Sequence, residues 1–123
     1  MDPKLREEIA QFHAEICSGL ADPNRILLLY TLVERPYNVT ELAEVVNLPQ
    51  PTVSRHLKVL RERGLVIPRR DGQSVFYSLA DERVIEALDL LRGLLADRLA
   101  GQVSLARRAN EELSSAHLPI DEP

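Results

Sequence analysis

The apolar positions between residues 50 and 63 follow the spacing of an α-helix. Val53, Leu57 and Leu60 recur at intervals of three and four residues, so they predict one buried face. Gly64 comes directly after this stretch, at a position where glycine commonly ends a helix. The other side of the predicted helix carries hydroxyl groups and cations, and we expect it to meet a partner from the solvent.

The next stretch changes to the composition of β-strands. Residues 65–70 and 74–79 are rich in Val, Ile, Phe and Tyr, and Asp71-Gly72 between them is a strong signal for a tight turn. The segment therefore predicts a β-hairpin, with Arg69 and Arg70 next to its tip. A helix with a polar face followed by a basic hairpin is the arrangement of a winged helix-turn-helix that holds DNA.

Three further helices are expected on the N-terminal side of this stretch. Residues 4–20 form an amphipathic pattern, and Asp22-Pro23 then provides an N-cap and a first residue for an apolar, buried helix. Asn38 and Glu41 have the spacing of a capping box at the start of a short helix through Val46. This short helix and the one that follows it predict the helix-turn-helix unit.

The last part of the chain predicts a long helix that is apolar over much of its surface. The helix opens at Asp81 and runs to Leu113. Its apolar residues are Val84, Ala87, Leu88, Leu90, Leu91, Leu94, Leu95, Leu99, Val103, Ala106 and Leu113. So large an apolar surface needs more cover than one small domain supplies, and we expect a homodimer joined by the N-terminal and C-terminal helices. Residues 114–123 are polar and contain proline, so a flexible tail is expected there.

Length and composition indicate one domain, which we place at residues 1–113. The chain has 123 residues, of which 45% are hydrophobic, so it can bury a core. A single cysteine excludes an internal disulfide and favours a reducing compartment. The first residues are charged and no stretch has the length of a membrane span, so we expect a cytoplasmic protein without a membrane partner.

The net charge of −4 is unusual for a protein that binds DNA, but its distribution is uneven. Residues 50–77 contain six Lys or Arg against two acidic residues, which gives this window +4 and leaves −8 for the rest of the chain. A basic patch on an acidic body attracts phosphate locally. The alternative for Arg61 and Arg63 is that they are only solvated charges at the end of a helix.

Four segments resemble the ArsR/SmtB family of bacterial winged-helix repressors. They are LADPNR at residues 20–25, VTELA at 39–43, QPTVSRHL at 50–57 and RRDGQSVFY at 69–77, in the order and spacing of the family. The resemblance implies a mainly α-helical fold with a small β-hairpin (α+β), a winged helix-turn-helix. It also implies a homodimer that binds double-stranded DNA, represses its operator and releases it when an inducer binds. One departure is Pro49, where the family often has a capping serine.

The predicted helix after Pro49 carries the candidates for reading DNA bases. Gln50, Ser54 and Arg55 are expected at base edges in the major groove, because Gln can bond adenine and Arg can bond guanine through two atoms. Thr52 lies close by. For His56, packing or a phosphate contact is the better interpretation, because it faces nearer to the core than Arg55.

The wing is expected to contact phosphate or the minor groove through Arg69 and Arg70, with Gln73 across the turn. The full predicted DNA-binding set is Gln50, Thr52, Ser54, Arg55, His56, Lys58, Arg69, Arg70 and Gln73.

The family's inducer is often a metal, but the usual ligand positions are not filled here. One type of site resembles Cys-Val-Cys-Asp-Leu, and the corresponding residues 38–42 read NVTEL, without a thiolate for a soft metal. The other type uses paired histidines on the last helix, and no histidine occurs between Asp81 and Leu113.

His13 and Cys17 remain as candidate ligands, four residues apart on one predicted helical face. The simplest interpretation is that both are packing residues. A second possibility is a divalent metal site rich in nitrogen and oxygen, in which carboxylates from the last helix or from the other subunit join His13. A third is that Cys17 acts as a thiol sensor, which would need exposure and a lowered pKa.

An enzyme is not expected, because the chain has no nucleotide-binding loop, no zinc-hydrolase motif and no serine or cysteine in the context of a nucleophile. Ser54 and His56 do not form a catalytic pair, since residues two apart on a helix point in different directions. The alternative to DNA binding is a winged helix that serves only for contact with another protein.

Overall fold

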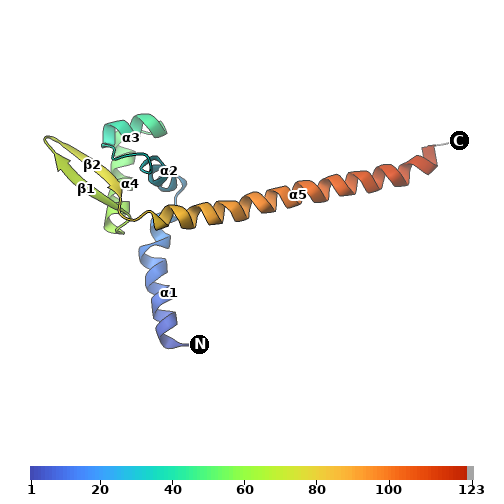
Figure 1. The fold of residues 1–123 in the computed structure, drawn as a ribbon, viewed down its shortest axis with the longest axis horizontal. Helices are drawn as coiled ribbons and strands as arrows, with labels where there is room; N and C mark the ends of the chain where they lie inside the picture. Colours follow the sequence, from blue (N-terminus) through green and yellow to red (C-terminus); the bar gives the residue numbers. More distant parts are fainter. Residues whose placement is uncertain (122–123) are drawn as a thin grey trace. The chain divides into compact units, whose positions relative to one another are not determined.

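The computed structural model describes the backbone of residues 1–121 and the side chains of residues 1–114. The described part is mainly α-helical and has one antiparallel hairpin, which confirms the predicted fold class. The elements are α1 (Pro3–Glu15), the 3₁₀ turn η1 (Cys17–Leu20), α2 (Pro23–Thr31), α3 (Val39–Val46), α4 (Gln50–Glu62), β1 (Val66–Asp71), β2 (Ser74–Leu79) and α5 (Arg83–Asp121) (Figure 1). They divide into two compact units, Met1–Ile85 and Glu86–Pro123.

The predicted helix starts are confirmed in atomic detail. Asp22 caps α2 by accepting a hydrogen bond from the Asn24 backbone N–H at 2.8 Å, with proline as the first helical residue. Asn38 and Glu41 form both bonds of a capping box at the start of α3. Pro49 is the N-cap of α4 and provides no side-chain bond, as its missing acceptor predicts.

The predicted helix over residues 4–20 is divided in two, so its C-terminal boundary was wrong. Helix α1 ends at Glu15, and η1 follows as a tighter turn. The break coincides with Gly19, which is buried and lies against the chain that follows α4. A Cβ atom added at this glycine would lie 2.9 Å from Leu65 Cδ1 and 3.3 Å from Arg63 Cγ. A larger residue at this position would displace the Leu65 side chain, and the helical pattern of the sequence does not reveal this close approach.

Helices α2, α3 and α4 enclose the core of the first unit. Their largest fully buried side chains are Leu28, Leu29, Leu42, Val53, Leu57 and Leu60. The three residues of this set that belong to α4 are the three that the sequence pattern assigns to its inner face. Each such side chain stabilises the fold by about 1.5–3 kcal/mol relative to an exposed one. This core fixes which side of α4 remains open to the solvent.

The hairpin β1–β2 is attached to the core at its base, and its tip points away from the helices (Figure 1). Asp71 pairs with Ser74, so the two residues of the turn are Gly72 and Gln73 rather than the expected Asp71-Gly72. Gly72 has a φ of 64°, a conformation that glycine adopts without strain. Near the base, Tyr37 N–H donates to Tyr77 O at 3.1 Å and Tyr77 N–H donates to Tyr37 O at 2.8 Å.

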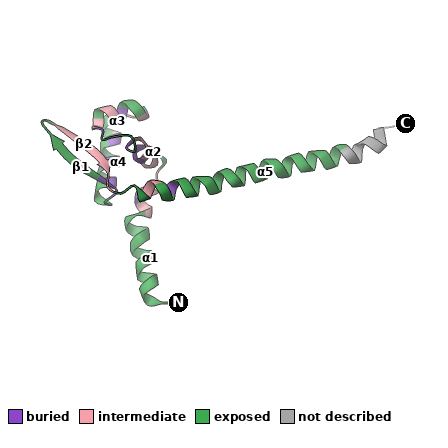
Figure 2. Ribbon diagram, in the orientation of Figure 1, coloured by how far each residue is buried: buried purple, intermediate pink, exposed green. Residues whose placement is uncertain are grey.

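Helix α5 makes up most of the second unit, and most of its length is exposed (Figure 2). Leu88 near its start is the exception, at 5% exposed. Leu90, Leu91, Leu94, Leu95 and Leu99 are between 51% and 78% exposed. The predicted long final helix is therefore present, and the large apolar side chains described beyond Leu88 are exposed. The backbone of α5 continues to Asp121, past the expected end of the helix at Leu113. The flexibility predicted for residues 114–123 stays a prediction.

Candidate nucleic-acid interface

Helix α4 presents to the solvent most of the polar side chains that the sequence singles out. Gln50, Ser54, Arg55 and Lys58 are exposed, whereas Thr52 is half-buried. The Arg55 guanidinium donates a hydrogen bond to Thr52 Oγ1 at 3.3 Å, which holds the arginine along the helix surface. The arrangement gives a polar ridge of hydrogen-bond donors and acceptors on a rigid helix, the kind of element that reads base edges in a major groove.

His56 occupies a different environment from its neighbours on α4. Its side chain is only 15% exposed. Its Nδ1 lies 3.4 Å from the Arg25 guanidinium, and its Nε2 lies 4.0 Å from Asp22 Oδ1. Both partners belong to the start of α2, so His56 faces the neighbouring helix rather than open solvent. These contacts favour the packing role over a direct contact with a base.

A cleft of about 440 Å³ runs along this side of α4. It is lined by Arg25, Arg55, His56, Lys58, Val59 and Glu62. Arg25 is not among the residues that the sequence analysis predicts to act in DNA binding. The sequence places it only within the LADPNR segment at the start of an apolar helix, and its closeness to α4 depends on how α2 and α4 pack.

The hairpin places Arg69 and Arg70, which are adjacent in the sequence, on opposite faces of the wing. Arg69 pairs with Phe76 and Arg70 pairs with Val75 in the hairpin, so the two arginines point to opposite faces. Both are exposed, as is Gln73 in the turn. Arg69 and Asp71 line a cleft of about 390 Å³ together with Pro36, Phe76 and Ser78. Arg69 thus shares its face with a carboxylate, while Arg70 lies on the other face.

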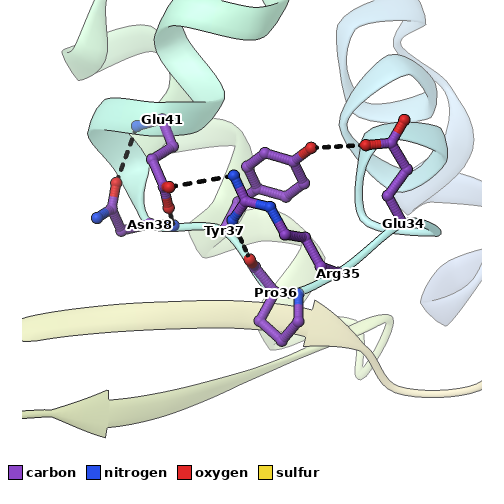
Figure 3. A network of polar contacts seen from close by, with 6 residues as sticks. All are labelled: Glu34, Arg35, Pro36, Tyr37, Asn38 and Glu41. Atoms are coloured by element: carbon purple, nitrogen blue, oxygen red, sulfur yellow. Dashed lines mark hydrogen bonds and ion pairs between the residues drawn. The ribbon is translucent and has the colours of Figure 1, made fainter.

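A network of polar contacts holds the segment between α2 and α3 (Figure 3). The Tyr37 hydroxyl donates to Glu34 Oε2 at 2.9 Å, and the Arg35 guanidinium lies 3.8 Å from the centre of the Tyr37 ring. Arg35 also donates to Glu41 Oε2 at 3.2 Å. Because Tyr37 is bonded to β2 through its backbone, the network joins the start of the helix-turn-helix to the base of the wing.

The same contacts shift two pKa values in this network. The hydrogen bond to Glu34, together with burial, raises the pKa of the Tyr37 hydroxyl above its ordinary value of 10. The backbone N–H of Asn38 and then the Arg35 guanidinium lower the pKa of the Glu41 carboxyl below 4.5. Glu41 is therefore held in its charged form, which strengthens both the capping box and its contact with Arg35.

This network occupies the segment in which resembling proteins carry a thiolate metal site. Asn38 Oδ1 accepts from the Glu41 backbone N–H at 2.8 Å, and Glu41 Oε1 accepts from the Asn38 backbone N–H at 3.0 Å. The side-chain oxygen atoms of Asn38 and Glu41 are thus engaged in the start of α3 and in the contact with Arg35. In this chain, residues 38–42 therefore start and cap α3.

His13 and Cys17 do not share a regular helix. His13 is exposed in the last turn of α1, whereas Cys17 is half-buried in η1. The expectation that their spacing places them on one helical face therefore no longer applies. Among the described residues, no group of three or more His, Cys, Asp and Glu side chains lies close enough together to hold a metal ion. Within the same residues, no helix is both long and apolar enough to cross a membrane.

Comparison with known proteins places this interface in context. Residues 22–67, which include α2, α3, α4 and the start of β1, match the model of a family described as bacterial regulatory protein, arsR family. The nodulation protein NolR of Rhizobium meliloti is 37% identical over 95 residues, which cover 77% of this chain and 78% of NolR.

Solved structures show the same architecture. The transcriptional repressor BigR from Xylella fastidiosa superposes with a TM-score of 0.64 at 34% identity, over 76% of this chain and 96% of the BigR chain. A homodimeric winged helix-turn-helix DNA-binding domain from Mycobacterium bovis, described as a possible ArsR-family transcriptional regulator, gives a TM-score of 0.68 at 24% identity, over 80% of this chain and 91% of that one.

Proposed function

The chain belongs to the arsR family of bacterial regulatory proteins, and from that premise we propose that it is a repressor that binds an inverted-repeat operator as a homodimer. It is a DNA-binding transcriptional regulator and not an enzyme. The repressor role is supported by the similarity to BigR, which is described as a transcriptional repressor. Because its partner is double-stranded DNA in a bacterial cell, we place its action in the cytoplasm.

The observation that carries this proposal is the division of α4 into two faces. Val53, Leu57 and Leu60 are 0% exposed, so the helix cannot rotate without opening the core. The opposite side is therefore fixed in the solvent, with Arg55 and Lys58 exposed on it. We assign base reading to Gln50, Ser54 and Arg55 and phosphate contacts to Lys58, because a rigid helix with such side chains suits a major groove.

The homodimer is supported by the exposed apolar faces of α1 and α5. Leu5, Ile9 and Phe12 of α1 and its C-cap residue Ile16 are between 36% and 51% exposed. Apolar patches of this kind are rare on monomers and mark an interface with another molecule. A second copy would relate two α4 helices by a twofold axis, and a spacing of about 34 Å between them matches one turn of DNA.

Release from the operator requires that an inducer change the dimer. A ligand weakens operator binding if it binds the free dimer more tightly than the operator-bound dimer, and a coupling of about 1–3 kcal/mol is sufficient for regulation. We therefore propose an inducer that acts on the dimer rather than on the DNA-reading side chains. Metal analysis of the purified dimer, with and without Cys17→Ser, tests whether this inducer is a metal ion.

The central experiment is selection of a binding site from random duplex DNA, followed by affinity measurements on the selected and random duplexes. We expect the wild type to select an inverted repeat. Arg55→Ala should lose about 1–3 kcal/mol of discrimination between the two duplexes, the value of one bidentate contact with a base. Arg61→Ala, an exposed arginine in the last turn of the same helix, is the matched control and should retain discrimination.

Two results would contradict the proposal. A wild type that binds no duplex more tightly than random DNA would leave the winged helix as a surface for another protein. An equal loss of affinity for both duplexes in Arg55→Ala would show that Arg55 contacts only the DNA backbone.

A further inference from the structure

We propose that Arg25 is a positioning residue for DNA reading, which sets the orientation of α4 by connecting His56 to the turn η1. This inference rests on the proposed function and concerns how the same interface is held. Arg25 comes from α2 and His56 from α4, and the two are 31 residues apart in the sequence. The assignment depends on contacts that are made entirely within the unit Met1–Ile85.

The Arg25 guanidinium is fixed in place by the backbone of η1. Its Nε donates to Gly19 O at 2.8 Å, and its Nη2 donates to Ser18 O at 3.0 Å. These two bonds use the rigid, planar fork of arginine, which a lysine cannot reproduce. The remaining nitrogen, Nη1, is thereby directed at His56 Nδ1, 3.4 Å away.

The contact with Arg25 also defines the state of the His56 ring. A guanidinium can only donate, so Nδ1 must accept and the proton of a neutral ring must be on Nε2. That N–H is on the side of Asp22 Oδ1, at 4.0 Å. Asp22 in turn caps α2 through the Asn24 backbone N–H. His56 is therefore held between two residues that are themselves tied to the start of α2.

A second contact joins η1 to the region where α4 ends. Gly19 lies so close to Leu65 that a methyl group in place of its hydrogen would meet the Leu65 Cδ1 atom at 2.9 Å. The turn η1 thus touches the DNA-reading element at two places, near its middle through Arg25 and His56 and beyond its end at Gly19. Two separated contacts thus set the direction of α4, in addition to the apolar core that fixes its inner face.

This arrangement matters for reading bases more than for holding phosphates. A functional side chain must be held within about 0.5 Å of its productive geometry, and a bond to a base edge depends on the placement of the whole helix. Attraction to phosphate depends much less on geometry. Loss of the Arg25 contact should therefore lower discrimination between operator and random DNA and leave the ionic part of binding intact.

A direct contact between Arg25 and a DNA phosphate is the competing explanation, because Arg25 lines the same cleft as Arg55 and Lys58. The salt dependence of binding separates the two. Removing a phosphate contact lowers the slope of log affinity against log salt by about 0.9. Removing a positioning contact leaves this slope unchanged.

The experiment compares Arg25→Met, Arg25→Lys, His56→Ala and His56→Gln with the wild type on the selected and random duplexes, at several salt concentrations. We expect Arg25→Met, Arg25→Lys and His56→Ala each to reduce the affinity ratio between the two duplexes about tenfold, with an unchanged salt slope. His56→Gln should recover most of the ratio, because its amide oxygen can accept from Arg25. The double variant Arg25→Met with His56→Ala should be no worse than either single variant.

A salt slope reduced by about 0.9 in Arg25→Met would overturn the proposal in favour of a phosphate contact. An unchanged affinity ratio in every variant would overturn it in favour of a purely structural role. If circular dichroism shows that Arg25→Met does not fold, the comparison of His56→Ala with His56→Gln decides the question. Equal affinity ratios between selected and random duplex for these two variants would reject the role of the Arg25–His56 contact. A wild type that shows no discrimination rejects the proposed function itself, which is a distinct outcome.

Discussion

Helices α4 and α5 both carry leucines at helical spacing, but α4 buries Leu57 and Leu60 within the chain, whereas among the described leucines of α5 only Leu88 is buried. Leu57 and Leu60 are 0% exposed, and they are covered by α2, α3 and the chain that follows α4. Leu91 and Leu95 of α5 are 61% and 56% exposed (Figure 2). The same pattern thus has a partner inside the molecule in α4 and, beyond Leu88, lacks a cover along the described part of α5.

The difference shows that a row of leucines on one face of a helix predicts burial of that face. It does not predict whether the same chain or a second molecule buries it. A polar example follows the same rule. Glu41 is bonded to Arg35 and Asn38 within the chain, whereas Gln50, Ser54 and Lys58 on the polar face of α4 are exposed. Side chains with internal partners should therefore control stability or, as proposed for Arg25 and His56, the orientation of α4, and exposed side chains should control assembly and contact with DNA.

The largest expected effect comes from placing a charge on the uncovered stripe. Leu91→Glu removes one leucine from each subunit of the proposed dimer interface. Because each leucine contributes about 1.5–3 kcal/mol, the dimer dissociation constant should rise at least about 100-fold. Sedimentation velocity over a range of concentrations measures it. Ala100→Glu is the control, because nine residues further along the helix it lies on the opposite side. A wild type that stays monomeric at micromolar concentration and still binds its operator tightly would refute the dimer.

The next effect tests the covered stripe. Leu57→Ala should lower the free energy of unfolding by about 2–5 kcal/mol, because it leaves a cavity in a core that is closed on all sides. Leu27→Ala, on the exposed side of α2 where Leu27 is 51% exposed, should cost clearly less. Urea denaturation at a fixed protein concentration measures both. Equal losses would mean that burial does not distinguish the two leucines.

The wing gives a smaller effect on DNA binding. Arg70→Ala should reduce the slope of log affinity against log salt by about 0.9, the value for one phosphate contact. Arg69→Ala should change it less, because Asp71 lies on the same face and offsets the charge of Arg69. Titrations of one operator duplex at several salt concentrations compare the variants. A larger change for Arg69→Ala would reverse this assignment.

The smallest effect concerns the internal network and its pH dependence. The pKa of Glu41 is lowered in the folded state, so its contribution is present above pH 4.5 and is lost as pH falls through the lowered pKa. Glu41→Gln should therefore reduce stability at pH 7 and flatten the loss of stability in acid, without changing operator discrimination. Thermal unfolding from pH 7 to pH 3 follows it. Asp81→Asn is a comparison, since its bonds with Arg83 lower the pKa of Asp81 to about 2 and shift its effect to lower pH.

The sequence by itself determined the elements whose signals are local. The caps at Asp22 and Asn38, the inner face of α4 and the strands of the wing all follow from residues within a few positions of one another. The need for a cover along α5 was also readable, because a helix with leucines on so much of its surface cannot stay uncovered in water.

The tertiary structure alone decided which distant residues meet. The close approach of Gly19 to Leu65 depends on how η1 packs against the chain after α4, and the Arg25–His56 contact depends on how α2 lies on α4. The separation of Arg69 and Arg70 onto opposite faces depends on the register of the hairpin. Contacts of this kind join segments that are distant in the sequence, so the spacing of residues along the chain cannot predict them.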